Sequence, residues 1–226
     1  MHVSTRVCPA ACLGLAVLAG PFLAHGAAPQ KPVKGKVQRN VYLSPANNFS
    51  IPVPQGFKIS DAHFDSYGAV SFHDDFGNLQ GILYAAAPPD TLARIQQGGN
   101  TNELLFDWLG NIAMPAWFKP ASPESRVLAE ASGTFKEMPA VYALIDAPGA
   151  NALEKVTVQN GKMERKREDS RRVAVIFHKG RYIYMLVLET VTFSFFESTT
   201  PAEPGGDWMG RADKLKPFYQ SISFRP

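Results

Sequence analysis

Cysteine is nearly absent from this chain: Cys8 and Cys12 are the only two, and both lie within the first 26 residues. The rest of the sequence can therefore form no disulfide, and it offers neither a thiol nucleophile nor a thiolate ligand for a metal ion. That remainder is roughly 200 residues long, which is enough for one hydrophobic core to stabilise a domain by packing alone.

A large excess of charge is also missing, since 23 Lys and Arg stand against 20 Asp and Glu. Catalytic motifs are missing as well. No serine lies in a Gly-x-Ser-x-Gly elbow, no glycine-rich phosphate loop occurs, and no acid pair is distinguished by its setting. The sequence therefore assigns no catalytic residue and no cofactor, and we expect no nucleic acid as a partner.

Residues 1–26 have the pattern of a secretory signal peptide. A basic residue near the start precedes an apolar run from Ala10 to Leu23, and small residues follow. The run is short and interrupted by Gly and Pro, which favours a cleaved signal over a membrane-spanning helix. We expect cleavage after Gly26 or Ala28 and a periplasmic or secreted protein; the alternative is an uncleaved anchor.

The remaining chain divides into two parts. Residues 27–40 are rich in Pro and Lys with few apolar side chains, a composition that predicts a disordered linker. Residues 41–226 contain no internal repeat and no second linker, and we predict that they form a single domain.

The longest apolar run of this domain lies in Arg172–Thr192, which predicts two strands joined by a turn at Lys179-Gly180. Pairing about this turn would place Phe177 opposite Tyr182. Because side chains alternate along a strand, each face receives its own set. One set is Val173, Val175, Phe177, Tyr182, Tyr184, Leu186 and Leu188; the other is Ala174, Ile176, Ile183, Met185 and Val187. Both sets are apolar, so this hairpin should be central in a sheet covered on both sides.

Other segments show hairpin and helix patterns. We predict paired strands at 68–73 and 79–85, at 126–135 and 140–145, and on either side of Asn160-Gly161. We predict helices at 101–113, stopped by Pro115, and at 207–219. The sum is an α+β fold with a mainly antiparallel sheet and two principal helices.

This layout resembles the extracytoplasmic PsbP-like families, which include the DcrB-type lipoproteins. The residues that carry the resemblance are the opening stretch Asn48–Phe57, then Gly68–Phe72, the mid-chain helix and the closing stretch Leu215–Phe224, in that order. The resemblance implies an antiparallel sheet flanked by helices and a binding or assembly role without catalysis.

The densest group of metal-ligand residue types lies between positions 61 and 75. It contains His63, Asp65, His73, Asp74 and Asp75, and imidazole with carboxylates suits a divalent cation. A metal-dependent or other hydrolase using this group is one alternative function. Acidic residues at a hairpin turn are also ordinary turn chemistry, which is the simpler interpretation.

Two other segments are candidate binding surfaces. The arm from Lys162 to Arg172 carries six basic and three acidic residues. It is expected to be an exposed edge or a projecting loop, which either binds an anionic partner or serves as a solvated edge that blocks aggregation. The run after the central hairpin either exposes phenylalanines for a partner or buries them in the core. The candidate binding residues are Arg165, Lys166, Arg167, Phe193, Phe195 and Phe196.

We predict a non-catalytic exported domain that binds or assists a protein or cell-envelope partner through one sheet face or the loop at 193–206. We expect a monomer whose membrane association would require an uncleaved signal. A carrier of a small ligand, held in an aromatic pocket between sheet and helix, is a further alternative.

Overall fold

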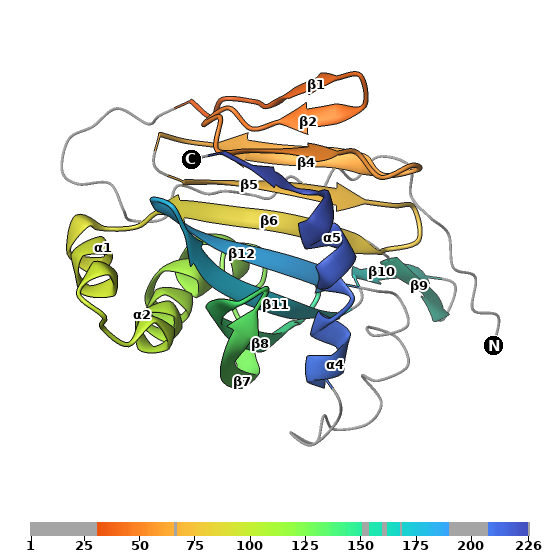
Figure 1. Cartoon of the computed structure of the whole chain (residues 1–226). Coiled ribbons are helices and arrows are strands. Elements are labelled where there is room, and N and C mark those ends of the chain that lie inside the picture. The colour runs from red at the N-terminus through yellow and green to blue at the C-terminus, as the bar shows by residue number, and fades with distance from the viewer. Residues whose placement is uncertain are drawn as a thin grey trace.

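The computed structural model describes residues 31–65, 67–150, 154–159, 162–167, 169–189 and 208–225. Its centre is a seven-stranded antiparallel sheet with the order β4-β5-β6-β12-β11-β8-β7 (Figure 1). The strands are β4 Lys58–His63, β5 Tyr67–His73, β6 Leu79–Ala86, β7 Arg126–Phe135, β8 Met138–Ala147, β11 Ser170–Lys179 and β12 Tyr182–Glu189. The predicted α+β class with a mainly antiparallel sheet is confirmed.

A smaller sheet and two short helices cover one face of the large sheet. The small sheet has the order β1-β2-β3-β13, and the helices come from the C-terminal part of the chain. The elements are β1 Lys36–Gln38, β2 Val41–Leu43, β3 Phe49–Pro52, α4 Trp208–Ala212, α5 Leu215–Ser221 and β13 Ser223–Phe224. Tyr42, Phe49 and Phe218 bring these elements into one buried cluster with the large sheet.

The other face of the large sheet is covered by helix α2, Thr101–Trp108, and by the π-helix η1, Leu109–Phe118, which continues it. The side chain of Asn100 caps α2 by accepting a hydrogen bond from the Glu103 amide. The predicted stop at Pro115 is wrong. Met114, Trp117 and Phe118 are buried, and their burial outweighs the backbone hydrogen bond lost at the proline.

The central hairpin is β11–β12, and the structure corrects its register. Lys179 pairs with Tyr182, so the turn is Gly180-Arg181, and Phe177 faces Tyr184 instead of Tyr182. Gly180 has φ of 64° at the first central position of the turn, which only glycine adopts readily there. The register moved by two residues, and a shift of two keeps every side chain on its face.

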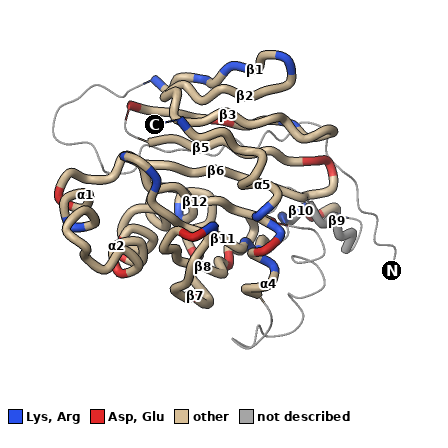
Figure 2. Tube along the Cα trace, viewed as in Figure 1, with Lys and Arg blue, Asp and Glu red and all other residues tan. Residues whose placement is uncertain are grey.

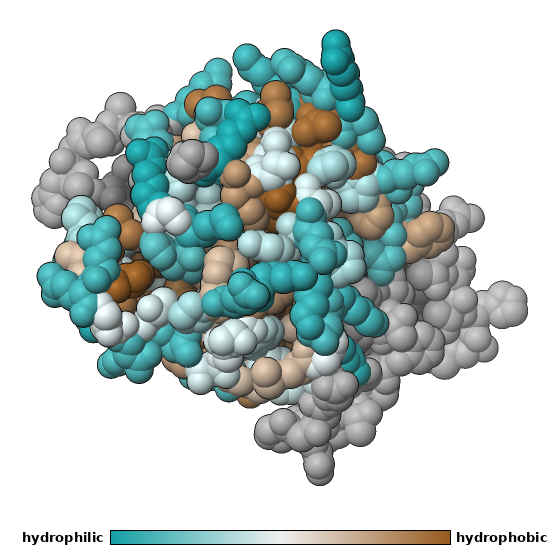
Figure 3. Space-filling view, in the orientation of Figure 1, coloured by the Kyte–Doolittle hydropathy of each residue, from teal (hydrophilic) through white to brown (hydrophobic). Residues whose placement is uncertain are grey.

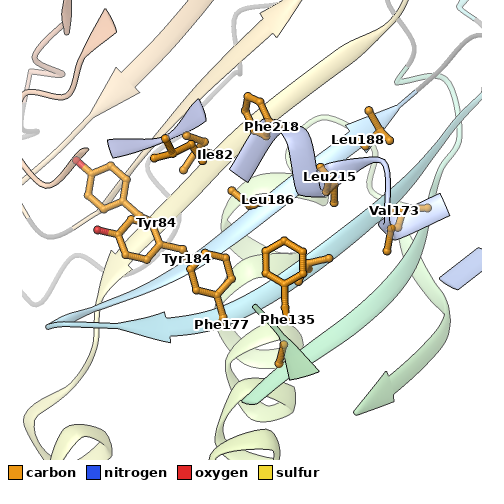
Figure 4. Close-up of a cluster of buried hydrophobic side chains, with 14 of the residues drawn as sticks. Ile82, Tyr84, Phe135, Val173, Phe177, Tyr184, Leu186, Leu188, Leu215 and Phe218 are labelled. Atoms are coloured by element: carbon orange, nitrogen blue, oxygen red, sulfur yellow. The ribbon is translucent and has the colours of Figure 1, made fainter. Parts of the chain in front are cut away.

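The predicted two-sided burial of this hairpin is therefore confirmed. One predicted set of side chains lies in the core under the small sheet, and the other lies in the core under α2 and η1. Figure 4 shows the first core, where Tyr84, Tyr184, Phe177 and Phe135 follow one another across four strands. The molecular face in Figure 3 is mainly hydrophilic, with apolar side chains gathered near its top.

Several boundaries differ from those predicted. Strand β1 and a bridge between Val33 and His63 lie in or beside the segment 27–40, so the ordered chain begins before Val41. Helix α1, Pro89–Gln96, and strand β4 were not predicted. The C-terminal helix is divided into α4 and α5 near Asp213. Backbone hydrogen bonds to β2 hold β1 in place, although this segment is mostly polar. A sequence pattern does not reveal such a pairing.

Strands β9 Glu154–Gln159 and β10 Lys162–Arg167 form a two-stranded ribbon of their own. Neither strand joins the small or the large sheet in the part of the chain that is described. The ribbon lies at the opposite end of the molecule from α1 and α2 (Figure 1).

Candidate functional site

The structure divides the predicted metal-ligand group between two ends of one hairpin. His63 pairs with Gly68 at one end of β4, while His73 pairs with Lys58 at the other end. His63 lies five positions further along β4 than Lys58, so the two ends of this hairpin are about 17 Å apart. His63 and His73 therefore cannot share a metal ion. The hydrolase alternative requires these residues to form one site, and they do not.

The aspartates near His73 are used by the turn between β5 and β6. Asp74 accepts hydrogen bonds from the amides of Phe76 and Asn78, both at 2.9 Å, and from the Asn78 side chain at 2.7 Å. Asp75 forms an exposed ion pair with Lys58. Among the described residues, no three His, Cys, Asp or Glu side chains come together to hold a metal ion. The five predicted ligands therefore do not come together as one site, and turn chemistry explains the position of Asp74.

His63 instead belongs to a buried polar cluster with Asp61, Tyr42 and Tyr84. Asp61 and His63 lie two residues apart on β4, so they point to the same face. The Tyr42 hydroxyl lies 2.5 Å from His63 Nε2 and 2.9 Å from Asp61 Oδ2. The Tyr84 hydroxyl lies 3.1 Å from His63 Nδ1. Four side chains from β2, β4 and β6 thus form one continuous chain of hydrogen bonds.

One arrangement of protons satisfies this chain. The Tyr42 hydroxyl donates to Asp61, so its oxygen accepts from the Nε2–H group of His63. The Nδ1 atom of His63 then accepts from the Tyr84 hydroxyl. This arrangement places a proton on Nε2 of His63, a position assigned from the partners around the ring.

The electrostatics of the cluster follow from its burial. Burial tends to raise the pKa of Asp61, but the His63 ring nitrogen 3.5 Å from its carboxylate, hydrogen bonds from the Gly35 amide and Tyr42, and the Lys34 charge hold that pKa well below its usual range. Burial, with the Asp61 charge, raises the pKa of Tyr42. Burial also raises the pKa of Tyr84 to about 12. At neutral pH, Asp61 is therefore an anion and both phenols are neutral donors.

This cluster holds the N-terminal segment against the edge of the large sheet. Asp61 Oδ2 accepts from the Gly35 amide at 2.6 Å, and Lys34 pairs with the same carboxylate at 3.3 Å. The residue next to this contact, Val33, exchanges backbone hydrogen bonds with His63. His63 is 1% exposed and is therefore enclosed, so its role is to join elements and not to meet a substrate.

The first prediction concerns Asp61. The change Asp61→Asn should lower the free energy of unfolding at pH 7 by about 1–3 kcal/mol, because three donors lose a charged acceptor. The folded-state pKa is lowered, so this contribution is present above the unfolded pKa of about 3.9 and is lost as the pH falls below it. The difference between wild type and variant should therefore shrink between pH 6 and pH 3 in urea unfolding.

The control for this prediction is Asp75→Asn, which removes an exposed carboxylate from an ion pair with Lys58. Its effect should stay below about 1 kcal/mol. A difference between wild type and Asp61→Asn that stays constant over this pH range would contradict the assignment of Asp61 as a buried anion.

The basic arm predicted at Lys162–Arg172 is divided by the structure. Arg171 and Arg172 lie on β11 and turn towards the body, where they pair with Asp146 and Glu189. Arg165 and Arg167 lie on β10 and are exposed. Lys166 is the β10 residue between these two arginines in the chain. The arm does not form the edge of the large sheet, which corrects the solvated-edge interpretation.

The other predicted surfaces have different outcomes. Phe193, Phe195, Phe196 and the rest of the loop to residue 206 lie outside the described residues. A free sheet face is not available along the central strands, since both faces of β11 and β12 are buried. Side chains including Trp108 and Ile183 fill the layer between sheet and helix, where a carried ligand was predicted.

The sequence did not indicate Tyr42 or Tyr84 as members of the buried cluster. The sequence did contain one indication. Asp61 and His63 are two residues apart, a spacing that places two polar side chains on the same face of a strand. The tyrosines are 19 and 21 residues away from Asp61 and His63 along the chain. Only the pairing of β4, β5 and β6, with the small sheet packed against them, brings these residues together.

Comparison with known proteins gives likenesses at the level of structure. No family model and no curated protein matches the chain. Cyanobacterial PsbP (CyanoP) from Synechocystis is 12% identical with a TM-score of 0.43, over 82% of this chain and 91% of that one. LpqN of Mycobacterium tuberculosis, involved in cell envelope biogenesis, is 12% identical with a TM-score of 0.32, over 87% and 90%.

A crystal structure from Bacteroides thetaiotaomicron is 10% identical with a TM-score of 0.40. This chain is covered over 84% of its length and spans half of that protein. The resemblance to PsbP-like proteins expected from the sequence is thus present as a weak structural likeness. Separately, none of the helices in the described ranges has the length and apolar character needed to cross a bilayer.

Proposed function

We propose that this protein is a non-catalytic, exported domain that binds a component of the bacterial cell envelope. The observation that carries the proposal is the β9–β10 ribbon, together with the way it is inserted. Export is supported by the signal-peptide pattern of residues 1–26.

The ribbon interrupts a hairpin that is otherwise complete. Ala147 at the end of β8 pairs with Ser170 at the start of β11. Two residues are enough to connect such a pair. The chain instead inserts residues 148–169, which is 22 residues (169 − 148 + 1).

Inserting these residues costs conformational entropy. Every ribbon side chain whose exposure is described is solvent-exposed: Lys162, Met163, Glu164, Arg165 and Arg167. These five side chains add nothing to either core, so core packing does not explain their presence. An exposed segment with a defined backbone is a common place for binding residues on a rigid scaffold.

A second prediction tests this function by removing the ribbon. Residues 151–168 are replaced with Gly-Ser-Gly, so that the Ala150 carbonyl, which accepts from Arg172, and the contact of Asp169 with the Gly149 amide are kept. The body should remain folded, because the pairs of β8 with β11 from Ala147 to Ala140 are retained. Binding to a bacterial envelope fraction, measured by co-sedimentation, should fall to background.

The control measures binding of the full chain to the same envelope fraction, once untreated and once after the fraction has been treated with protease. Binding by the full chain that the ribbon-less variant loses supports the function. Equal binding by the two would place the surface elsewhere, and no binding by the full chain to either fraction would overturn the proposal.

A further inference from the structure

The ribbon has an uneven distribution of charge along its length. Its strands contain five basic residues and two acidic ones, a formal charge of +3 (5 − 2). Glu154 and Arg167 pair at the base, while Lys162 and Gln159 pair at the tip. The acidic Asp169 is also at the base, where it accepts a hydrogen bond from the Gly149 amide at 3.0 Å. The three cross-strand pairs nearer the base, which include Lys155 with Lys166 and Val156 with Arg165, sum to +3, whereas the three pairs nearer the tip sum to zero.

An apolar side chain lies among these cations. Met163, next to the tip, has 63% of its surface exposed, and strand alternation places Arg165 and Arg167 on its own face, while Lys162 and Glu164 are its neighbours in the chain. Figure 2 shows basic positions on β10 at the edge of the body. A protruding apolar side chain with two cations on its own face has the chemistry of a contact with the interface of an anionic bilayer.

The size of the ribbon favours a lipid surface over an acidic protein as its binding partner. Each strand has six residues, so the ribbon is about 20 Å long and about 10 Å wide, or roughly 200 Å² for one face. A stable, specific protein interface buries roughly 800 Å² on each partner. A bilayer requires no matching shape, and its attraction adds up over cations.

We propose that the β9–β10 ribbon binds the surface of anionic phospholipid bilayers, with Arg165 and Arg167 on the headgroup phosphates and Met163 in the interfacial layer. This inference rests on the proposed function and names the envelope component. It replaces the expectation that membrane association would require an uncleaved signal.

The test measures binding of the chain without residues 1–26 to two kinds of vesicle. One contains phosphatidylglycerol and phosphatidylcholine in equal parts, and the other contains phosphatidylcholine alone. Each cation near the surface contributes about fivefold, so a net charge of +3 should give roughly a hundredfold preference for the anionic vesicles at low salt. High salt should remove most of this preference.

Two matched variants locate the contact. Arg165→Gln with Arg167→Gln should weaken binding to anionic vesicles by roughly 25-fold, since two cations are lost. Arg94→Gln with Lys136→Gln removes the same charge from exposed positions at the opposite end of the molecule, and it should change binding less than about threefold. Unchanged melting temperatures would show that the parent chain and the two double variants are folded alike.

Three results would overturn the lipid inference. One is equal binding to neutral and anionic vesicles, and another is an equal loss in the ribbon and control variants. The third is a chain that binds neither kind of vesicle but binds the envelope fraction, and that loses this binding when the fraction is treated with protease. In that case the proposed envelope function stands and its partner is a protein, whereas absence of binding to vesicles and fraction alike rejects both proposals.

Discussion

The change Phe177→Ala is expected to lower the free energy of unfolding by about 3–5 kcal/mol. Phe177 is 0% exposed and lies on β11 in the middle of the large sheet. Its ring centroid is 5.8 Å from those of Phe135 and Tyr184 and 5.6 Å from that of Tyr219. Alanine would remove the ring that joins β7, β12 and α5, and neighbours held in a sheet can refill the space only in part.

The measurement is urea unfolding followed by far-UV circular dichroism, with the change read from the midpoint at constant slope. The matched control is Phe76→Ala, in the turn between β5 and β6, where the side chain is 71% exposed. That change should stay within about 0.5 kcal/mol. A loss below about 1 kcal/mol for Phe177→Ala would contradict the placement of this residue at the centre of the core.

The change Arg172→Met is expected to have an effect of similar size, about 3–5 kcal/mol, for a different reason. Arg172 Nε lies 3.1 Å from Glu189 Oε2, and the Glu189 side chain is only 3% exposed. The same arginine donates to Ser170 Oγ at 3.0 Å and to the Ala150 carbonyl at 3.4 Å. Its removal leaves a buried carboxylate without this cation, and that cost exceeds the loss of one hydrogen bond.

A double variant separates the two causes. Arg172→Met with Glu189→Met removes both charges, so it should recover most of the stability lost in the single variant. The matched control is Arg126→Met, since Arg126 pairs with Asp146 at 3.5 Å while its side chain is 71% exposed. Its effect should be below about 1 kcal/mol. If the double variant is as unstable as the single one, the buried carboxylate is not the source of the loss.

Stability and binding are therefore assigned to different parts of this protein. The ion pair of Arg172 with Glu189 and the cluster around His63 use polar groups inside the body, where each has a partner. The ribbon has its cations outside. Variants of the ribbon should alter binding and leave unfolding nearly unchanged, whereas Phe177→Ala and Arg172→Met should do the reverse until the body unfolds.

The sequence alone determined the class of fold and the two-sided burial of the central hairpin. Both follow from alternation over a few residues, and an error of two residues in the turn left Phe177 and Tyr184 on their predicted face. The hairpins around Asp74 and Asn160 were also predictable, because turn residues act locally.

Tertiary structure decided which distant residues meet. The pairing of β4 with β5 separates His63 from His73, and the small sheet brings Tyr42 to His63. The pairing of Ala147 with Ser170 turns residues 148–169 into an excursion from a closed hairpin. Alternation and turn chemistry depend on near neighbours in the chain, whereas these contacts depend on strand order and register, which arise only when the whole sheet forms.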